Sequence, residues 1–181
     1  MIYCFLASGF EETEAIATVD AIRRGELEVT TVGVGAKVVT GSHGIPVVAD
    51  ITDSELHDIS DLTGVILPGG MPGTLNLEKS EIVKHCLKYA MDNGKLVAAI
   101  CAAPSILGKL GMLEGRTAVC YDGFEELLFG AEIGEGRTCT DGNLITARGA
   151  GVAIEFGMEI VRYFKGNGEA RAVGMSMKCK E

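Results

Sequence analysis

The sequence predicts an α/β protein with a mostly parallel sheet that is covered by helices on both faces. Short apolar runs alternate along the chain with segments of helical periodicity, and helices of about 10 to 15 residues between strands make right-handed crossovers. Glycine is abundant, with 25 residues in 181, which is typical of many tight strand-to-helix turns. We therefore expect a three-layer α/β/α sandwich, formed as a single domain over residues 1–181.

The first predicted unit is a strand followed by a helix. Ile2–Leu6 is an apolar run, Ala7–Gly9 is a turn, and a helix is expected from Glu11 to Arg24. Acidic residues fill the first turn of this helix and basic residues fill its last turn, which complements the helix dipole. The apolar start is too short for a signal-peptide core and has no basic flank, so we expect a cytoplasmic protein.

Two further strands and a hairpin follow. Glu28–Val34 is rich in β-formers, and the segments Val38–Thr40 and Ile45–Val48, separated by Gly-Ser-His-Gly, predict a hairpin. Gly64–Leu67 is a short apolar strand that stops at the turn 68–70, Pro-Gly-Gly.

The second half continues the alternation. A helix over Ser80–Asp92 ends at Asn-Gly, a common C-terminal stop, and a buried strand, Lys95–Ile100, precedes a helix over Pro104–Leu110. The remaining predicted elements are a strand at Ala118–Cys120, a short helix at Phe124–Leu128, hairpin strands at Thr138–Thr140 and Leu144–Thr146, and a helix at Val152–Phe164.

Composition excludes several classes of function. The formal charge is −9 and there is no run of Lys or Arg, so nucleic-acid binding is not expected. No apolar stretch approaches the roughly 20 residues that span a bilayer, so no membrane association is expected. The six cysteines form no Cys-x-x-Cys pair and the three histidines are dispersed, which predicts reduced thiols and no metal site. Neither a dinucleotide-binding motif nor a phosphate-binding loop is present, so we expect no cofactor.

Cys101 has the surroundings of a nucleophile. It follows a buried strand and precedes a helix, with small residues at Ala99, Ala102 and Ala103, as in a nucleophile elbow with Cys in place of Ser. A helix N-terminus stabilises a thiolate and lowers its pKa. The alternative is a structural cysteine at a strand-to-helix junction, but the carboxyl end of a parallel strand is where sites gather in such sheets.

Two other segments should reach the same edge of the sheet. Backbone N–H groups of the 68–70 turn, with those after Cys101, would form an oxyanion hole; the alternative is a plain turn. Acidic residues Glu11, Glu12 and Glu14 follow the first strand, and helical phase alone does not decide which of them faces the site.

Four segments together resemble the ThiJ/PfpI superfamily. They are Ser8–Glu14 (SGFEETE), Leu67–Gly70 (LPGG), Ala98–Pro104 (AAICAAP) and Thr146–Gly151 (TARGAG). The sequence is most similar to the branch that contains the parkinsonism-associated deglycase and its bacterial ThiJ-like relatives. The resemblance implies a flavodoxin-like sandwich of the class I glutamine amidotransferase type, a homodimer, and no cofactor.

The resemblance also implies roles for four residues. Cys101 is the reactive cysteine, Glu14 is a protonated acid that hydrogen-bonds to it, and the N–H groups of Gly70 and Ala102 form the oxyanion hole. The protease-like branch has a His directly after the nucleophile, where this chain has Ala102, so peptidase activity is not expected.

Other positions of the branch are matched less closely. Cys120 stands where the branch has a His near the site, and it is either a resolving thiol for an oxidised Cys101 or a packed residue. His43 falls where the branch has a basic residue that reaches the partner's site. Arg24 and Arg148 match other basic positions of the family motif and are, with Cys120 and His43, candidate neighbours of the site; Arg148 is expected to anchor structure rather than substrate.

Two functions of different classes follow. The first is a cofactor-free glyoxalase or deglycase that takes methylglyoxal, glyoxal or their early adducts, with a hemithioacetal on Cys101 and proton transfer by Glu14. The second is a redox-sensing stress protein or holdase chaperone in which Cys101 is oxidised to a sulfinate.

Overall fold

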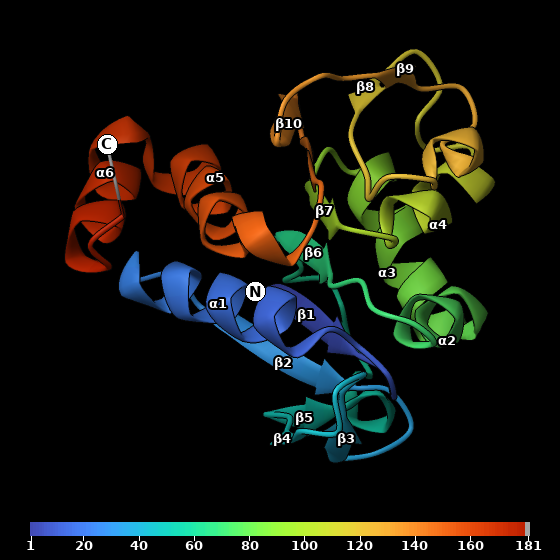
Figure 1. The fold of residues 1–181 in the computed structure, drawn as a ribbon. Helices are drawn as coiled ribbons and strands as arrows, with labels where there is room; N and C mark the ends of the chain where they lie inside the picture. The colour runs from blue at the N-terminus through green and yellow to red at the C-terminus, as the bar shows by residue number, and fades with distance from the viewer. Residues whose placement is uncertain (180–181) are drawn as a thin grey trace.

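The computed structural model, which describes residues 1–179, has a seven-stranded sheet at its centre (Figure 1). Its strand order is β10-β11-β7-β6-β1-β2-β5, and every neighbouring pair is parallel except β10 with β11. The strands are β1 (Ile2–Leu6), β2 (Val29–Gly33), β5 (Ile51–Thr52), β6 (Gly64–Leu67), β7 (Leu96–Ile100), β10 (Thr138–Asp141) and β11 (Leu144–Ala147). The mostly parallel sheet predicted from the sequence is confirmed.

Helices cover both faces of this sheet (Figure 1). On one face lie α1 (Glu12–Arg24) and α5 (Ala153–Lys165), with α6 (Asn167–Ser176) packed outside them. On the other lie α2 (Gly73–Lys79), α3 (Glu81–Asp92) and α4 (Pro104–Lys109). The three-layer, flavodoxin-like arrangement is therefore confirmed.

The alternation of side chains along each buried strand produces two core clusters. In β1, Phe5 packs with α3 and α4, whereas Leu6 packs with α1 and α5. Both side chains are fully buried, as expected for parallel strands with helices on each face.

The smaller elements partly follow the prediction. The hairpin of β3 (Val38–Thr40) and β4 (Pro46–Val48) is confirmed. The predicted strand at 118–120 is wrong at its end: β8 stops at Ala118, because the Val119 N–H donates to the Thr146 hydroxyl at 2.9 Å. The remaining elements are β8 (Thr117–Ala118), β9 (Glu132–Ile133) and the 3-10 turns η1 (Asp53–Glu55), η2 (Glu125–Leu127) and η3 (Ala150–Val152).

The central strands create the position of the site. After β1 the chain turns onto the face of α1, and after the neighbouring β6 it turns onto the opposite face, toward α2. Diverging connections of this kind open a crevice at the carboxyl ends of parallel strands. The carboxyl end of β7 adjoins this crevice, because β7 pairs with β6. Among the described helices, none has the length and apolar character needed to cross a membrane.

Candidate active site

Cys101 lies directly after β7 in a backbone conformation that side chains rarely adopt. Its φ is +64°, in the left-handed region, which costs a residue other than glycine roughly 1–2 kcal/mol. Two backbone hydrogen bonds hold it there: its N–H donates to the Ala147 carbonyl, and its carbonyl accepts from the Tyr121 N–H, both at 2.9 Å. The sharp turn predicted between strand and helix is present, and α4 begins three residues later at Pro104.

Glu14 is the glutamate that reaches Cys101. The carboxylate of Glu11 caps α1 by accepting the Glu14 N–H at 2.6 Å, and Glu12 turns toward the hairpin loop. The Glu14 side chain is buried, accepts the Gly69 N–H at 2.8 Å, and hydrogen-bonds to the Cys101 sulfur. The structure thus shows that Glu14, rather than Glu11 or Glu12, faces Cys101, which helical phase alone did not decide.

Backbone N–H groups from two loops point at the same sulfur. The Gly70 and Ala102 N–H groups both hydrogen-bond to Cys101 Sγ, which brings together the four residues that the family resemblance implied. Gly70 has a φ of +88°, and a Cβ there would lie 2.4 Å from the Glu11 nitrogen, so a side chain is excluded.

A glycine is required at position 69 because neighbouring atoms leave no room for a side chain, and not because of its backbone dihedral angles. A Cβ on Gly69 would lie 2.7 Å from the Cys101 Cβ and 2.9 Å from Glu14 Oε2. The missing side chain is therefore what lets the cysteine and the acid meet.

The electrostatics of the pair differ from the expectation from sequence. Burial raises the pKa of Glu14 to about 7, against the hydrogen bonds from Gly69 and Cys101. Burial, followed by the Glu14 carboxylate, raises the pKa of Cys101 to about 12, and the Ala102 and Gly70 N–H groups only partly oppose this. The predicted lowering of the Cys101 pKa is therefore wrong, because burial outweighs the backbone donors. A proton on Glu14 removes the opposing charge and supplies a donor to sulfur, which makes the thiolate less unfavourable, while burial continues to oppose it.

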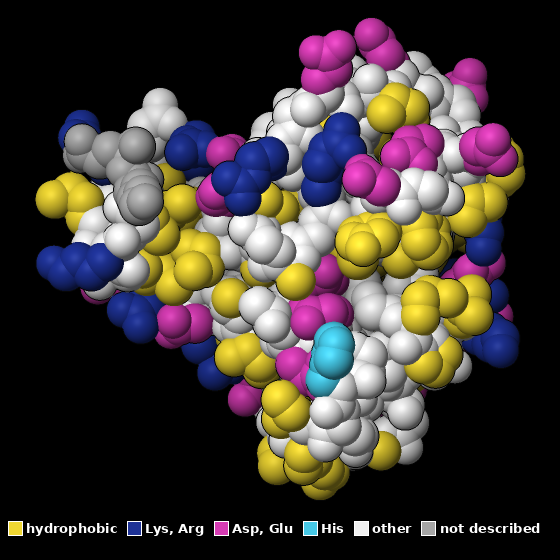
Figure 2. Space-filling view, in the orientation of Figure 1, with side chains coloured by type: hydrophobic (Ala, Val, Ile, Leu, Met, Phe, Trp, Pro, Cys, Tyr) yellow, Lys and Arg dark blue, Asp and Glu magenta, His cyan; other side chains and the backbone are white. Residues whose placement is uncertain are grey.

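His43 lies beside the site on the β3–β4 loop. Its Nδ1 is 3.0 Å from the buried Glu12 carboxylate and 3.9 Å from that of Glu11. Figure 2 shows a histidine against acidic side chains on this face of the molecule. Burial opposes ionisation of Glu12, but hydrogen bonds from His43 and from the Ile45 N–H outweigh it and lower the pKa of Glu12 to about 2. These donors leave the Glu12 carboxylate satisfied within the protein.

The two predicted arginines differ in position. Arg148 donates to the carbonyls of Gly134 and Gly136 and pairs with Asp122 at 2.9 Å, so it anchors the loops beside the site, as expected. Arg24 lies at the far end of α1 and pairs with Asp20. Ten residues separate it from Glu14, roughly 15 Å along the helix, so its assignment as a neighbour of the site is wrong.

Cys120 packs in the core. Its side chain is buried in the cluster that includes α3 and α4, whereas Cys101 packs against the cluster on the other face of the sheet. Burial raises the pKa of Cys120 to about 11. This position favours the packing interpretation over a resolving thiol.

Tyr121 was not identified from the sequence. Its ring carbons Cδ2 and Cε2 lie 3.2 and 3.7 Å from the point where a Gly149 Cβ would stand, and Glu14 Oε1 lies 3.9 Å from that point. The ring therefore flanks the reactive pair. In the sequence, the only feature that pointed to Tyr121 was its place directly after Cys120, at the end of a predicted strand.

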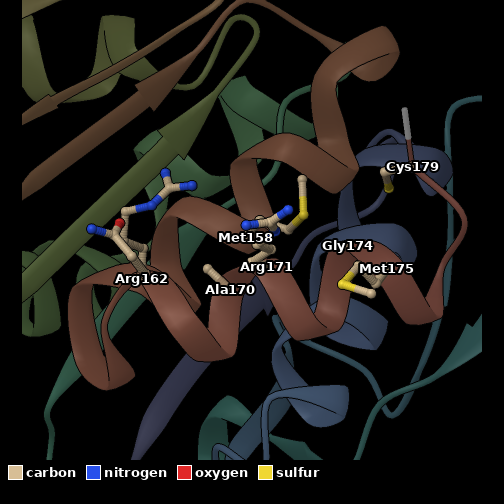
Figure 3. A pocket seen from close by; sticks show the side chains of 8 residues that line it. Met158, Arg162, Ala170, Arg171, Gly174, Met175 and Cys179 are labelled. Atoms are coloured by element: carbon tan, nitrogen blue, oxygen red, sulfur yellow. The ribbon is translucent and has the colours of Figure 1, made fainter. Parts of the chain in front are cut away.

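A separate cavity of about 450 Å³ lies between α5 and α6 and shares no lining residue with the reactive pair. Figure 3 shows Met158, Met175 and Cys179 around it. Nothing in the structure shows what covers it.

A first prediction concerns Gly69→Ala. We expect the added methyl group to separate Glu14 from Cys101, so that the rate of Cys101 alkylation by iodoacetamide loses the inflection near pH 7 that the pKa of Glu14 gives it. Stability should fall by about 1–3 kcal/mol. Gly168→Ala is the control, because no atom lies within 4 Å of its Cβ position. An unchanged profile in Gly69→Ala would contradict the close contact.

A second prediction concerns stability against pH. Glu14 keeps its proton in the folded protein up to about pH 7 but loses it near pH 4.5 when unfolded, so the folded state binds more protons between these values. Stability therefore falls as pH rises through this range, by about 2–3 kcal/mol for this group. Urea unfolding from pH 5 to 8 should show that Glu14→Gln lacks this component. If the difference in unfolding free energy between the wild type and Glu14→Gln does not depend on pH, the assignment of this component to Glu14 is refuted.

Comparison with known proteins places the chain in a family. The model of the DJ-1/PfpI family matches residues 1–163. Protein DJ-1 homolog A of Arabidopsis thaliana is 38% identical over 173 residues, covering 93% of this chain. The chain spans only 44% of that relative's length.

Other relatives match along nearly their whole length. The Parkinson disease protein 7 homolog of Danio rerio is 34% identical, covering 97% of this chain and 95% of the relative. A protein of Caenorhabditis elegans named glutathione-independent glyoxalase DJR-1.2 is 31% identical, covering 86% of this chain and 83% of its own.

Among solved structures, that of oxidized Toxoplasma gondii DJ-1 superposes with a TM-score of 0.95 at 30% identity, covering 99% of this chain and 98% of that one. The sequence motifs, the fold and the geometry around Cys101 agree with these matches, and the chain belongs to the DJ-1/PfpI family.

Proposed function

We propose that this protein is a cofactor-free glyoxalase that converts methylglyoxal or glyoxal to the corresponding hydroxyacid, and that it acts on their early adducts by the same chemistry. The observation that carries the proposal is the buried hydrogen bond between Glu14 and Cys101, together with the Gly70 and Ala102 N–H groups that reach the same sulfur. The similarity to a relative named a glyoxalase supports it.

The first step is attack by the Cys101 thiolate on the aldehyde carbon. A C–S bond forms, the C=O π electrons move to oxygen, and the Gly70 and Ala102 N–H groups, which now reach the sulfur, stabilise that oxyanion. Glu14, protonated up to about pH 7, then supplies the proton that gives the hemithioacetal.

The second step is an internal redox rearrangement. The Glu14 carboxylate, now without its proton, removes the hydrogen on the former aldehyde carbon and returns a proton to the adjacent carbonyl carbon, while the hydroxyl proton of the hemithioacetal moves to the oxygen of that carbonyl. The first carbon is thereby oxidised to a thioester and the second is reduced to an alcohol, with no external oxidant. Water then cleaves the C–S bond, releasing the hydroxyacid and restoring the thiol.

A third prediction tests this function. Incubated with methylglyoxal, the wild type should form lactate, Cys101→Ser should form none above the buffer rate, and Glu14→Gln should be slowed by about 10²–10⁴-fold. Cys139→Ser, another partly exposed cysteine, should retain full activity. Lactate formation unchanged in Cys101→Ser would exclude the mechanism.

The same contacts support a second candidate function, redox sensing. A sulfinate on Cys101 would place its oxygens among the donors that now reach the sulfur: two backbone N–H groups and the protonated Glu14. We propose that oxidation of Cys101 marks a stress response or holdase activity.

A fourth prediction tests this candidate. Mild peroxide should add two oxygens to Cys101 in preference to Cys139 and Cys179, and Glu14→Ala should abolish the preference, as read by mass spectrometry of the peptides. Equal oxidation of all three partly exposed cysteines would count against a sensor.

We also propose that the protein is cytoplasmic and forms a homodimer. Exposed apolar side chains on α1 and on the hairpin, Ile16, Val38, Ile45 and Val48, support a surface that a second copy covers.

A further inference from the structure

A cavity of about 370 Å³ lies beside Tyr121, and neither Cys101 nor Glu14 lines it. It is formed by Tyr121, Asp122, Arg137, Arg148 and the turn at 149–152. Tyr121 and Gly149 are its residues nearest to Glu14, since both the tyrosine ring and Glu14 Oε1 lie within 4 Å of the Gly149 Cβ position.

The ring of Tyr121 has an unusual combination of surroundings. It lies against Gly149, where a Cβ would stand only 3.2 Å from Tyr121 Cδ2, yet the residue is 54% exposed. Within the part of the chain that the structure describes, its hydroxyl makes no hydrogen bond. Its backbone is fixed, because the Tyr121 N–H donates to the Cys101 carbonyl. The Tyr121 backbone is thus tied to the turn of the nucleophile, and its ring is an exposed aromatic surface beside Gly149.

The charges around the cavity cancel. Arg148 pairs with Asp122 at 2.9 Å, and Arg137 pairs with Glu155 at 3.1 Å and donates to the Gly151 carbonyl. A ligand carboxylate would have to compete with these partners. An uncharged group that covers the ring gains apolar contact without breaking an ion pair.

We infer that Tyr121 is a specificity-determining residue and that this cavity receives the side group of the substrate, with a preference for uncharged apolar or aromatic groups. The inference rests on the proposed function for its substrate, a 2-oxoaldehyde. The aldehyde carbon is bonded to Cys101 Sγ, and the substituent on the ketone carbon extends past Glu14 Oε1 onto the Tyr121 ring.

A fifth prediction compares phenylglyoxal with glyoxal as substrates. Tyr121→Ala should lower kcat/KM for phenylglyoxal by roughly 2- to 10-fold more than for glyoxal, mainly through KM, because only the larger substrate loses an aromatic contact. Tyr121→Phe should keep the preference. Phe129→Ala is the control, because it removes an aromatic residue of matched exposure, 55% against 54%. It should leave the ratio of kcat/KM for phenylglyoxal to that for glyoxal unchanged.

A measurement without turnover separates this inference from the proposed function. In the wild type, iodoacetanilide should alkylate Cys101 faster than iodoacetamide does. In Tyr121→Ala, this advantage of iodoacetanilide should be lost. Ala150→Leu adds bulk to the lining of the same cavity and should reduce the advantage of iodoacetanilide as well. If no aldehyde is turned over but this ratio behaves as expected, the function fails and the subsite stands. Equal effects of Tyr121→Ala on both alkylating agents would overturn the subsite.

Discussion

The buried hydrogen bond between Glu14 and Cys101 is the constraint on which the rest of the site depends. It joins α1 to the end of β7, across the loop that follows β6. Three local features make it geometrically available: the Glu11 cap that fixes the first turn of α1, the bare backbone of Gly69, and the left-handed conformation of Cys101. None of these features suffices alone, and together they bring two ionisable groups into one contact.

Burial is costly for both members of the pair, and the protein offsets it with backbone dipoles. The Gly69 N–H serves the carboxyl group, and the Gly70 and Ala102 N–H groups serve the sulfur. Fixed peptide dipoles need no reorganisation as charge moves between oxygen and sulfur. The pair can therefore exchange one proton and one negative charge during a reaction while the surrounding structure stays in place.

The sequence predicted the parts of the fold that have strong local signals. Apolar runs marked β1, β6 and β7, and paired small residues marked the turn at Cys101. It did not predict α2 or α6, because Gly73 and the glycines of α6 weaken helix propensity and tertiary packing decides their conformation. Likewise, β5 and β9 have two residues each, too few to show a period.

The site was predictable to a similar extent. Spacing identified Cys101, and the family resemblance supplied Glu14, Gly70 and Ala102. The direction of the Cys101 pKa was not predictable, because it depends on burial and on a carboxylate 87 positions earlier in the chain. Arg24 was misplaced because the motif match was followed, although the predicted helix from Glu11 to Arg24 already put it nearly three turns from Glu14. Tyr121 was missed because its role comes from the approach of the 149 backbone, which no local pattern encodes.

The hydrogen bond from Tyr121 to the Cys101 carbonyl uses only main-chain atoms. Any residue with an N–H at position 121 would make the same bond, so the nucleophile is supported independently of which side chain faces the cavity. This separation gives the protein an evolutionary freedom: the wall that a substrate meets can change by single substitutions while the reactive turn keeps its shape. Diversification of substrate preference within such a scaffold then requires no accompanying change in the catalytic pair.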